Sequence, residues 1–247
     1  MAIDGGTSSH TAFMYAPFEG EATVGNFNRL DPAQLRRYFR TAQEHGWDVA
    51  SHLRRPGHGH GGGRVQRSGR AYPTPTAPQC HPRLLPVGSG LDQMGRHNIG
   101  AVIQPTFLYW EGDMIFRDVG RDRAANYKPA RKFLDHGIPL AANSDIPSTV
   151  SQNPFPGLYA LVTRRNNVGT LVAPDQALTR TEALHAYTTG GTWLTREETL
   201  KGTLTPGKVA DICVIDRDYF TVPDAEIKDI QVVMTMVDGR VVYTATA

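Results

Sequence analysis

Apolar residues recur with a helical period in the first part of the chain. Asp31-Pro32 precedes this pattern and Gly46 follows it, which suits a helix with an Asp N-cap and a Pro in its first turn. The apolar positions have the spacing i, i+3, i+4, i+7 and are Leu35, Tyr38, Phe39 and Ala42. The pattern predicts a helix here, followed by a short strand over 47–52.

Between residues 91 and 145, predicted helices and strands alternate. A helix is expected near 91–98, a strand over 99–105, a second helix over about 126–136, and a short apolar strand before Asp145. Alternation of this kind is typical of parallel βα units. The sequence therefore predicts an α/β fold for this part of the chain.

The pattern changes after residue 179. A helix is expected over 179–189, with Gly190-Gly191 interrupting the chain after it. Three strands are then expected over 207–216, 230–237 and 240–244, and Asp238-Gly239 is a strong hairpin signal between the last two. We predict two units, residues 1–204 and a small antiparallel β segment at 205–247.

Composition and charge exclude several classes of protein. The chain has 247 residues, a net charge of +2 and two cysteines, Cys80 and Cys213. This charge does not favour a polyanionic partner, and two cysteines do not make a disulfide framework. No apolar run is long enough to cross a bilayer, and the N-terminus lacks signal-peptide features. We therefore expect a cytoplasmic protein that binds neither membrane nor nucleic acid.

Residues 53–90 do not resemble the rest of the chain. They contain six arginines and no Asp, Glu or Lys, and they are rich in Gly, Pro and His. We expect this segment to be disordered, since long loops without secondary structure are uncommon inside domains. Coding DNA translated in another frame would explain the bias best. Two alternatives are a genuine disordered insert and a binding loop, with metal held by His58 and His60 or nucleic acid held by the arginines of 54–83.

Asp145 is the candidate catalytic residue. It follows the short apolar strand Pro139-Leu-Ala-Ala142, and barrel enzymes carry their reactive groups at such carboxyl ends of strands. A carboxylate there can act as general base and then as general acid. The alternative is a loop carboxylate that caps Ser148 or a nearby helix.

Several motifs resemble the amidohydrolase superfamily, in particular the branch that contains N-substituted formamide deformylase. The similar segments cover about 1–52 and 91–247. They are Asp4-Gly-Gly-Thr-Ser-Ser9, Gly46-Trp-Asp-Val-Ala-Ser-His52, Asn143-Ser-Asp-Ile-Pro147 and Gly207-Lys-Val-Ala-Asp-Ile-Cys-Val-Ile-Asp216. In another reading frame, the codons of Cys80-His-Pro-Arg-Leu-Leu-Pro86 permit a family-like Val-Ile-His-Gly-Tyr-Phe-Pro. The first barrel strand of the family, with its His-x-His pair, has no counterpart, so we expect a chain truncated at its N-terminus.

The resemblance implies a fold and a reaction. The fold is a partial (β/α)8 barrel of the TIM type, roughly strands four to eight, with a C-terminal antiparallel segment from an accessory β domain. The reaction is metal-dependent hydrolysis of a non-peptide C–N bond in a small amide or formamide. His52 and Asp145 would be metal ligands for Zn²⁺ or a similar divalent ion, and Asp145 would transfer the proton.

We expect this chemistry to be impaired, because a catalytic zinc normally has three protein ligands and this chain retains two. An inactive remnant or a non-catalytic protein that binds a partner is the alternative, and a homo-oligomer is compatible with its open strand edges. Nucleic-acid binding through 54–83 is the least favoured reading, because Tyr72 is the one aromatic residue there that could stack on a base.

Overall fold

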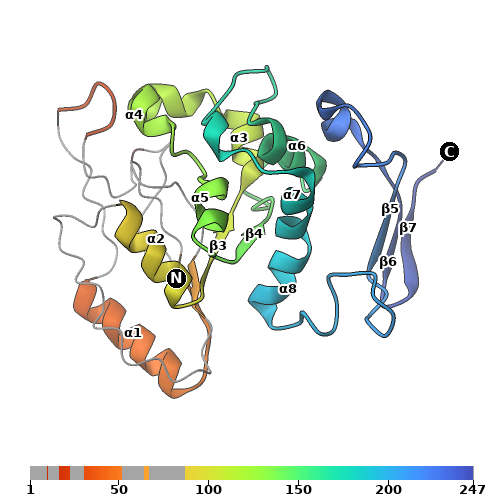
Figure 1. Ribbon diagram of the computed structural model, residues 1–247, viewed down its shortest axis with the longest axis horizontal. Helices are drawn as coiled ribbons and strands as arrows, with labels where there is room; N and C mark the ends of the chain where they lie inside the picture. The colour runs from red at the N-terminus through yellow and green to blue at the C-terminus, as the bar shows by residue number, and fades with distance from the viewer. Residues whose placement is uncertain (1–9, 11–16, 23–30, 52–63, 67–86, 247) are drawn as a thin grey trace.

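Two β-sheets organise the computed structural model, which describes residues 10, 17–22, 31–51, 64–66 and 87–246 (Figure 1). One sheet has the strand order β1-β2-β3-β4 and the other has the order β5-β6-β7. The fold is therefore a mixed α/β fold, as the sequence predicts. His52, the Asp4 motif and both histidines of the proposed binding loop lie outside the described residues.

The four-stranded sheet is mixed in direction. Its strands are β1 (Val49–Ser51), β2 (Arg64–Gln66), β3 (Ile99–Ile103) and β4 (Leu140–Ala142). β3 and β4 are parallel, which confirms the predicted βα unit between them, but β2 is antiparallel to both β1 and β3. We expected disorder at 64–66. The structure pairs these residues instead, because a strand between β1 and β3 satisfies backbone groups on both.

Helices connect and cover the strands. The N-terminal helix α1 begins after Asp31, whose carboxylate accepts a hydrogen bond from the Ala33 N–H at 3.2 Å, as the sequence predicts for an N-cap. The helices are α1 (Pro32–Glu44), α2 (Val87–Arg96), α3 (Pro105–Glu111), α4 (Met114–Ala124), α5 (Ala130–Asp135), α6 (Phe155–Thr163), α7 (Arg180–Tyr187) and α8 (Thr189–Thr195), with short 3₁₀ turns η1 (Pro174–Gln176) and η2 (Asp224–Asp229). No helix in the described part of the chain is long and apolar enough to span a bilayer.

The main core lies between the β3–β4 pair and α6. Ile103, Leu140 and Leu161 are among its buried side chains, and Ile227 and Ile230 extend it to η2, which packs against α6. A second cluster surrounds α4 and includes Phe18, Leu108, Val119 and Val172. The first cluster thus includes residues of β3, β4 and α6, and the second includes residues of α3 and α4.

A buried arginine stabilises the layer around α6. The Arg164 side chain is 1% exposed and donates to the backbone carbonyls of Tyr127, Lys128, Val172 and Ala173. Burial lowers the pKa of Arg164 to about 9, so the group keeps its charge at neutral pH. Four backbone acceptors offset the cost of burying this charge.

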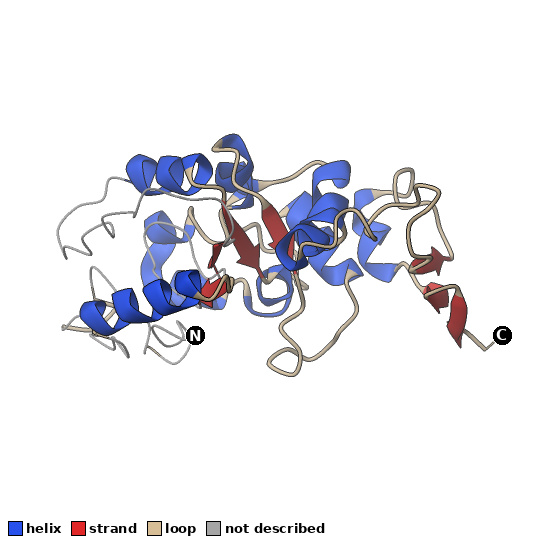
Figure 2. Ribbon diagram, turned by 90° about the horizontal axis from the view of Figure 1, so that it is seen from below, coloured by secondary structure: helices blue, strands red, loops and turns tan. Residues whose placement is uncertain are grey.

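The C-terminal sheet lies at one end of the molecule (Figures 1 and 2). Its strands β5 (Ile212–Ile215), β6 (Val232–Val237) and β7 (Arg240–Thr244) are all antiparallel, as predicted. Asp238 and Gly239 join β6 to β7 with φ angles of 49° and 73°. Positive φ at both central residues matches the twist of a two-residue hairpin, so the predicted turn is confirmed.

Candidate functional site

Asp145 lies just beyond the carboxyl end of β4. The chain leaves β4 at Ala142 and still follows β3, because the Asn143 N–H donates to the Ile103 carbonyl at 3.0 Å. This contact keeps the start of the loop beside the end of the neighbouring parallel strand. The structure thus places the predicted residue at the strand end where sequence analysis expected it.

The backbone of Asp145 is in the left-handed region, with φ of 60°. Its carbonyl accepts a hydrogen bond from the Ser148 N–H at 2.7 Å, and the Ile146–Pro147 peptide bond is cis. Asp tolerates this region better than most residues that carry a Cβ, although it remains costly. The hydrogen bond from Ser148 is therefore made to the backbone carbonyl of Asp145 and not to its carboxylate.

The Asp145 side chain is half-buried. Among the described residues, no donor forms a hydrogen bond or an ion pair with its carboxylate, and the capping role that we considered as an alternative is not seen. A structural Asp in a loop commonly bonds to nearby backbone N–H groups. An unpaired, half-buried carboxylate at a strand end is instead available to a ligand or to a reacting proton.

Two threonine hydroxyls fix the residue before Asp145. Thr106 Oγ1 and Thr149 Oγ1 both donate to the Ser144 carbonyl, at 3.1 Å and 2.7 Å. Thr106 belongs to the first turn of α3, directly after β3, and its side chain is fully buried. Sequence analysis missed Thr106. Its position just after a strand parallel to β4 was the signal that could have identified it.

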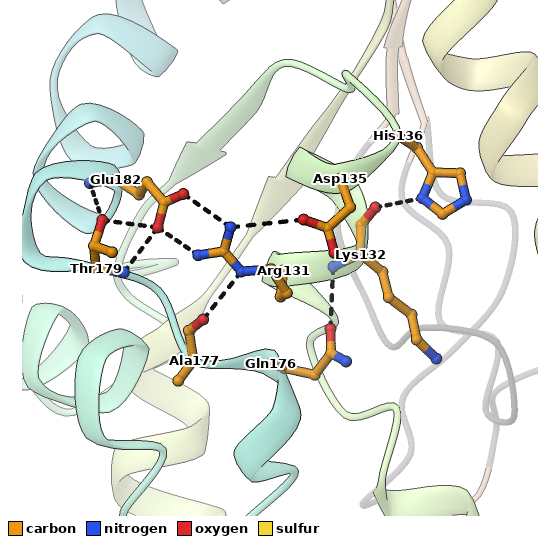
Figure 3. A network of polar contacts seen from close by, with 8 residues as sticks. All are labelled: Arg131, Lys132, Asp135, His136, Gln176, Ala177, Thr179 and Glu182. Atoms are coloured by element: carbon orange, nitrogen blue, oxygen red, sulfur yellow. Dashed lines mark hydrogen bonds and ion pairs between the residues drawn. The ribbon is translucent and has the colours of Figure 1, made fainter.

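A polar network holds the helix that precedes β4 (Figure 3). Arg131 on α5 forms a two-pronged ion pair with Glu182 on α7 and also donates to the Ala177 carbonyl at 3.3 Å. The same Glu182 accepts from both the N–H and the hydroxyl of Thr179, completing a capping box at the start of α7. The network ties α5 to α7, and α7 packs against β4.

The charge state of Glu182 follows from these contacts. Hydrogen bonding from Arg131 is the main cause that lowers the pKa of Glu182 to about 2, and the bonds from Thr179 act in the same direction. The carboxylate is therefore ionised throughout the neutral range, and its ion pair with Arg131 persists there.

The described residues do not form a metal centre by themselves. No group of three or more His, Cys, Asp or Glu side chains that could hold an ion is found among them. Of the two predicted ligands, Asp145 is described and His52 is not, so the structure does not test whether the two meet. The two predicted ligands are fewer than the three protein ligands that a catalytic zinc normally has.

Comparison with known proteins identifies the family. The sequence model of the amidohydrolase family matches residues 1–243, which is nearly the whole chain. The chain belongs to the amidohydrolase family. Two curated proteins are similar to this amidohydrolase. N-substituted formamide deformylase of Arthrobacter pascens is 28% identical over 67% of the chain and 30% of its own length. The putative amidohydrolase YtcJ of Bacillus subtilis (strain 168) is 24% identical over 97% of the chain and 46% of its own length.

Solved structures share the fold. An uncharacterised metal-dependent hydrolase from Pyrococcus horikoshii OT3 has a TM-score of 0.69 at 20% identity, covering 91% of this chain and 45% of its own. One from Pyrococcus furiosus has a TM-score of 0.67 at 20% identity, covering 89% of this chain and 44% of its own. The chain therefore spans less than half the length of each of these four proteins.

Proposed function

We propose that this amidohydrolase hydrolyses a non-peptide C–N bond of an amide or formamide and that Asp145 transfers the proton. One observation carries the proposal, namely that the half-buried carboxylate at the carboxyl end of β4 has no hydrogen-bond or ion-pair partner among the residues that the structure describes. Family membership supports the reaction class, since the family acts as hydrolases of amide-type bonds.

The proposed role of Asp145 has two steps. The carboxylate first accepts a proton from the attacking water while the water oxygen bonds to the carbonyl carbon of the substrate. The resulting carboxylic acid then donates that proton to the nitrogen as the C–N bond breaks, which releases an amine and the acid product. One group can serve both steps because its protonation state changes between them.

Zn²⁺ or a similar divalent ion remains our proposal for the cofactor, with Asp145 and His52 as ligands. When bound, such an ion lowers the pKa of its water and polarises the amide carbonyl. The two Pyrococcus structures similar to this chain are metal-dependent hydrolases, which supports the proposal. The sequence retains two of the expected ligands, and a catalytic zinc normally has three from the protein, so we propose that catalysis by this chain is impaired relative to a complete site.

We further propose that residues 1–204 form the later part of a (β/α)8 barrel and that residues 205–247 belong to an accessory β domain. The parallel β3–β4 pair supports the first unit and the antiparallel sheet of β5, β6 and β7 supports the second. The substrate would be a small amide, because one relative is an N-substituted formamide deformylase.

The test is hydrolysis of an N-substituted formamide by the purified chain with added Zn²⁺, measured as released formate. We expect slow release, and Asp145→Asn should lower its rate by about 10²–10⁴-fold, the usual contribution of a general acid–base group. Asp175→Asn is the matched control, because Asp175 is an exposed carboxylate on η1. Equal rates for wild type and Asp145→Asn would contradict the role of Asp145.

The non-catalytic alternative makes a different prediction in the same assay. If the wild-type chain releases no formate above the rate without protein at any added Zn²⁺ concentration, the chain is a partner-binding protein or an inactive remnant of the family. The exposed strand β7 is the observation that favours this second reading.

A further inference from the structure

We propose that Thr106 is a positioning residue for Asp145. The inference rests on the proposed function, because it assumes that the carboxylate of Asp145 has to be held in one place. Thr106 belongs to α3 and lies 38 residues before Ser144 in the sequence. Its hydroxyl donates a hydrogen bond to the Ser144 carbonyl.

The contact acts on the peptide unit that determines the position of Asp145. The Ser144 carbonyl and the Asp145 N–H belong to one planar peptide group. A hydroxyl that holds the carbonyl oxygen therefore fixes the orientation of this peptide group. The φ angle of Asp145 is the rotation about the N–Cα bond that follows it. Thr106 and Thr149 hold this oxygen together, at 3.1 Å and 2.7 Å.

The backbone of Asp145 needs such support. Its φ of 60° lies in a region that residues with a Cβ seldom adopt, and such conformations persist where the surroundings hold them. Release of the Ser144 carbonyl would let the loop relax toward a commoner conformation. The carboxylate would then move away from the strand end while remaining chemically intact.

Thr106 contributes what Thr149 cannot. Thr149 lies in the same loop as Asp145 and moves with it, whereas Thr106 is fully buried in the first turn of α3. Its hydroxyl therefore ties the loop after β4 to the rigid end of β3. The Asn143 N–H bond to the Ile103 carbonyl, at 3.0 Å, ties the same two segments one step earlier.

The test compares Thr106→Val, which removes the hydroxyl at nearly constant shape, with Thr106→Ser, which restores it. We expect Thr106→Val to lower kcat for the N-substituted formamide about 10- to 100-fold at an unchanged KM, because a displaced catalytic group affects the reaction more than binding. Thr106→Ser should recover most of the loss. Thr163→Val is the matched control, since the Thr163 hydroxyl donates to the Tyr159 carbonyl within α6.

A second readout does not depend on turnover. The ¹³Cα and ¹³Cβ chemical shifts of Asp145 report its backbone conformation, and they should leave the left-handed range in Thr106→Val and return in Thr106→Ser. Unchanged shifts in a folded Thr106→Val protein would overturn the inference. So would a Thr106→Ser protein that behaves like Thr106→Val.

The two readouts separate this inference from the proposed function. If Asp145→Asn leaves formate release unchanged, the proposed function fails, yet the chemical shifts still decide whether Thr106 holds the loop. If Thr106→Val does not fold, Thr149→Val removes the other hydroxyl from the same carbonyl. Its Asp145 shifts should stay in the left-handed range in a folded protein, because Thr106 still ties the loop to the end of β3, and shifts that leave this range would overturn the inference.

Discussion

The Tyr187 hydroxyl is buried and lies very close to Gly157. A Cβ placed on Gly157 would be 1.9 Å from the Tyr187 oxygen, and no hydrogen-bond partner for this oxygen is found in the described part of the chain. Burial raises the pKa of Tyr187 above its ordinary value. A buried polar atom without a partner costs free energy. The Tyr187 ring therefore fills its site, but its hydroxyl lowers the stability of the fold.

This geometry predicts that substitutions at the two positions are coupled. Tyr187→Phe should leave the free energy of unfolding unchanged or raise it by up to about 1 kcal/mol, because it removes an unsatisfied hydroxyl. Gly157→Ala alone should destabilise by about 1–3 kcal/mol through overpacking. In the Tyr187→Phe background the same change should cost less, although the ring Cζ still lies 3.0 Å from the new Cβ.

A double-mutant cycle from urea unfolding measures this coupling. Equal costs of Gly157→Ala in the two backgrounds would show that the hydroxyl is not the group that blocks the methyl group. Gly191→Ala is a useful reference, because nothing lies within 4 Å of a Cβ built on Gly191.

At the scale of elements, Glu182 connects two helices that pack around β4. It pairs with Arg131 on α5 and completes the capping box of α7 (Figure 3). Its pKa is lowered from 4.5 to about 2 in the folded chain. A carboxyl whose pKa is lower in the folded state adds stability above its unfolded pKa, and this stability is lost as the pH falls through the folded pKa.

The expected pH window is therefore about pH 4.5 down to about pH 2. Glu182→Gln keeps an acceptor for Thr179 but loses the charge, so it should destabilise by about 1 kcal/mol at pH 7, the difference between a charge-assisted and a neutral hydrogen bond. The difference between wild type and variant in urea unfolding should shrink as the pH falls through this window.

Glu44→Gln is the control for the Glu→Gln change itself, because Glu44 is exposed at the end of α1. It should leave the difference from wild type near zero at every pH. A stability difference for Glu182→Gln that stays constant from pH 7 to pH 3 would contradict the assigned role of the ion pair.

The elements that local signals define could be predicted from the sequence, and those that depend on distant contacts could not. Helix α7 starts directly after Thr179, as expected, but Thr188 leaves helical geometry and α8 then includes both Gly190 and Gly191. A Cβ on Gly190 would lie 2.0 Å from the Leu140 carbonyl, so this glycine allows α8 to approach β4. A glycine that serves close packing is indistinguishable in sequence from one that ends a helix.

Helix α6 and part of the candidate site could not be predicted from local sequence signals either. α6 is buried on nearly all sides, so its sequence has no polar face to show a helical period. The position of Asp145 at a strand end could be predicted because it comes three residues after an apolar strand. Thr106 could not, since its contact with Ser144 exists only after β3 and β4 have paired in parallel.

At the scale of the whole molecule, the C-terminal sheet presents an open edge. Among the described strands, β7 pairs with β6 alone (Figure 1). All five residues of β7 are exposed. Val241, Val242 and Tyr243 are 53%, 61% and 49% exposed, and Arg240 is the one charged residue in the strand. Edge strands of soluble proteins usually carry charges, prolines or bulges that prevent pairing with another chain.

The open edge predicts concentration-dependent self-association through β7. An antiparallel pair of two β7 strands centred on Val242 would place Val241 opposite Tyr243 of the second copy, so apolar side chains would face one another. Val242→Lys should shift the chain toward monomer in sedimentation velocity, because two lysines would then meet at the centre of the pair. Val168→Lys, at a loop position that is 73% exposed, should sediment like wild type. A wild-type chain that stays monomeric over the whole concentration range would show that the edge does not pair with itself, and it would favour a different polypeptide as the partner of β7.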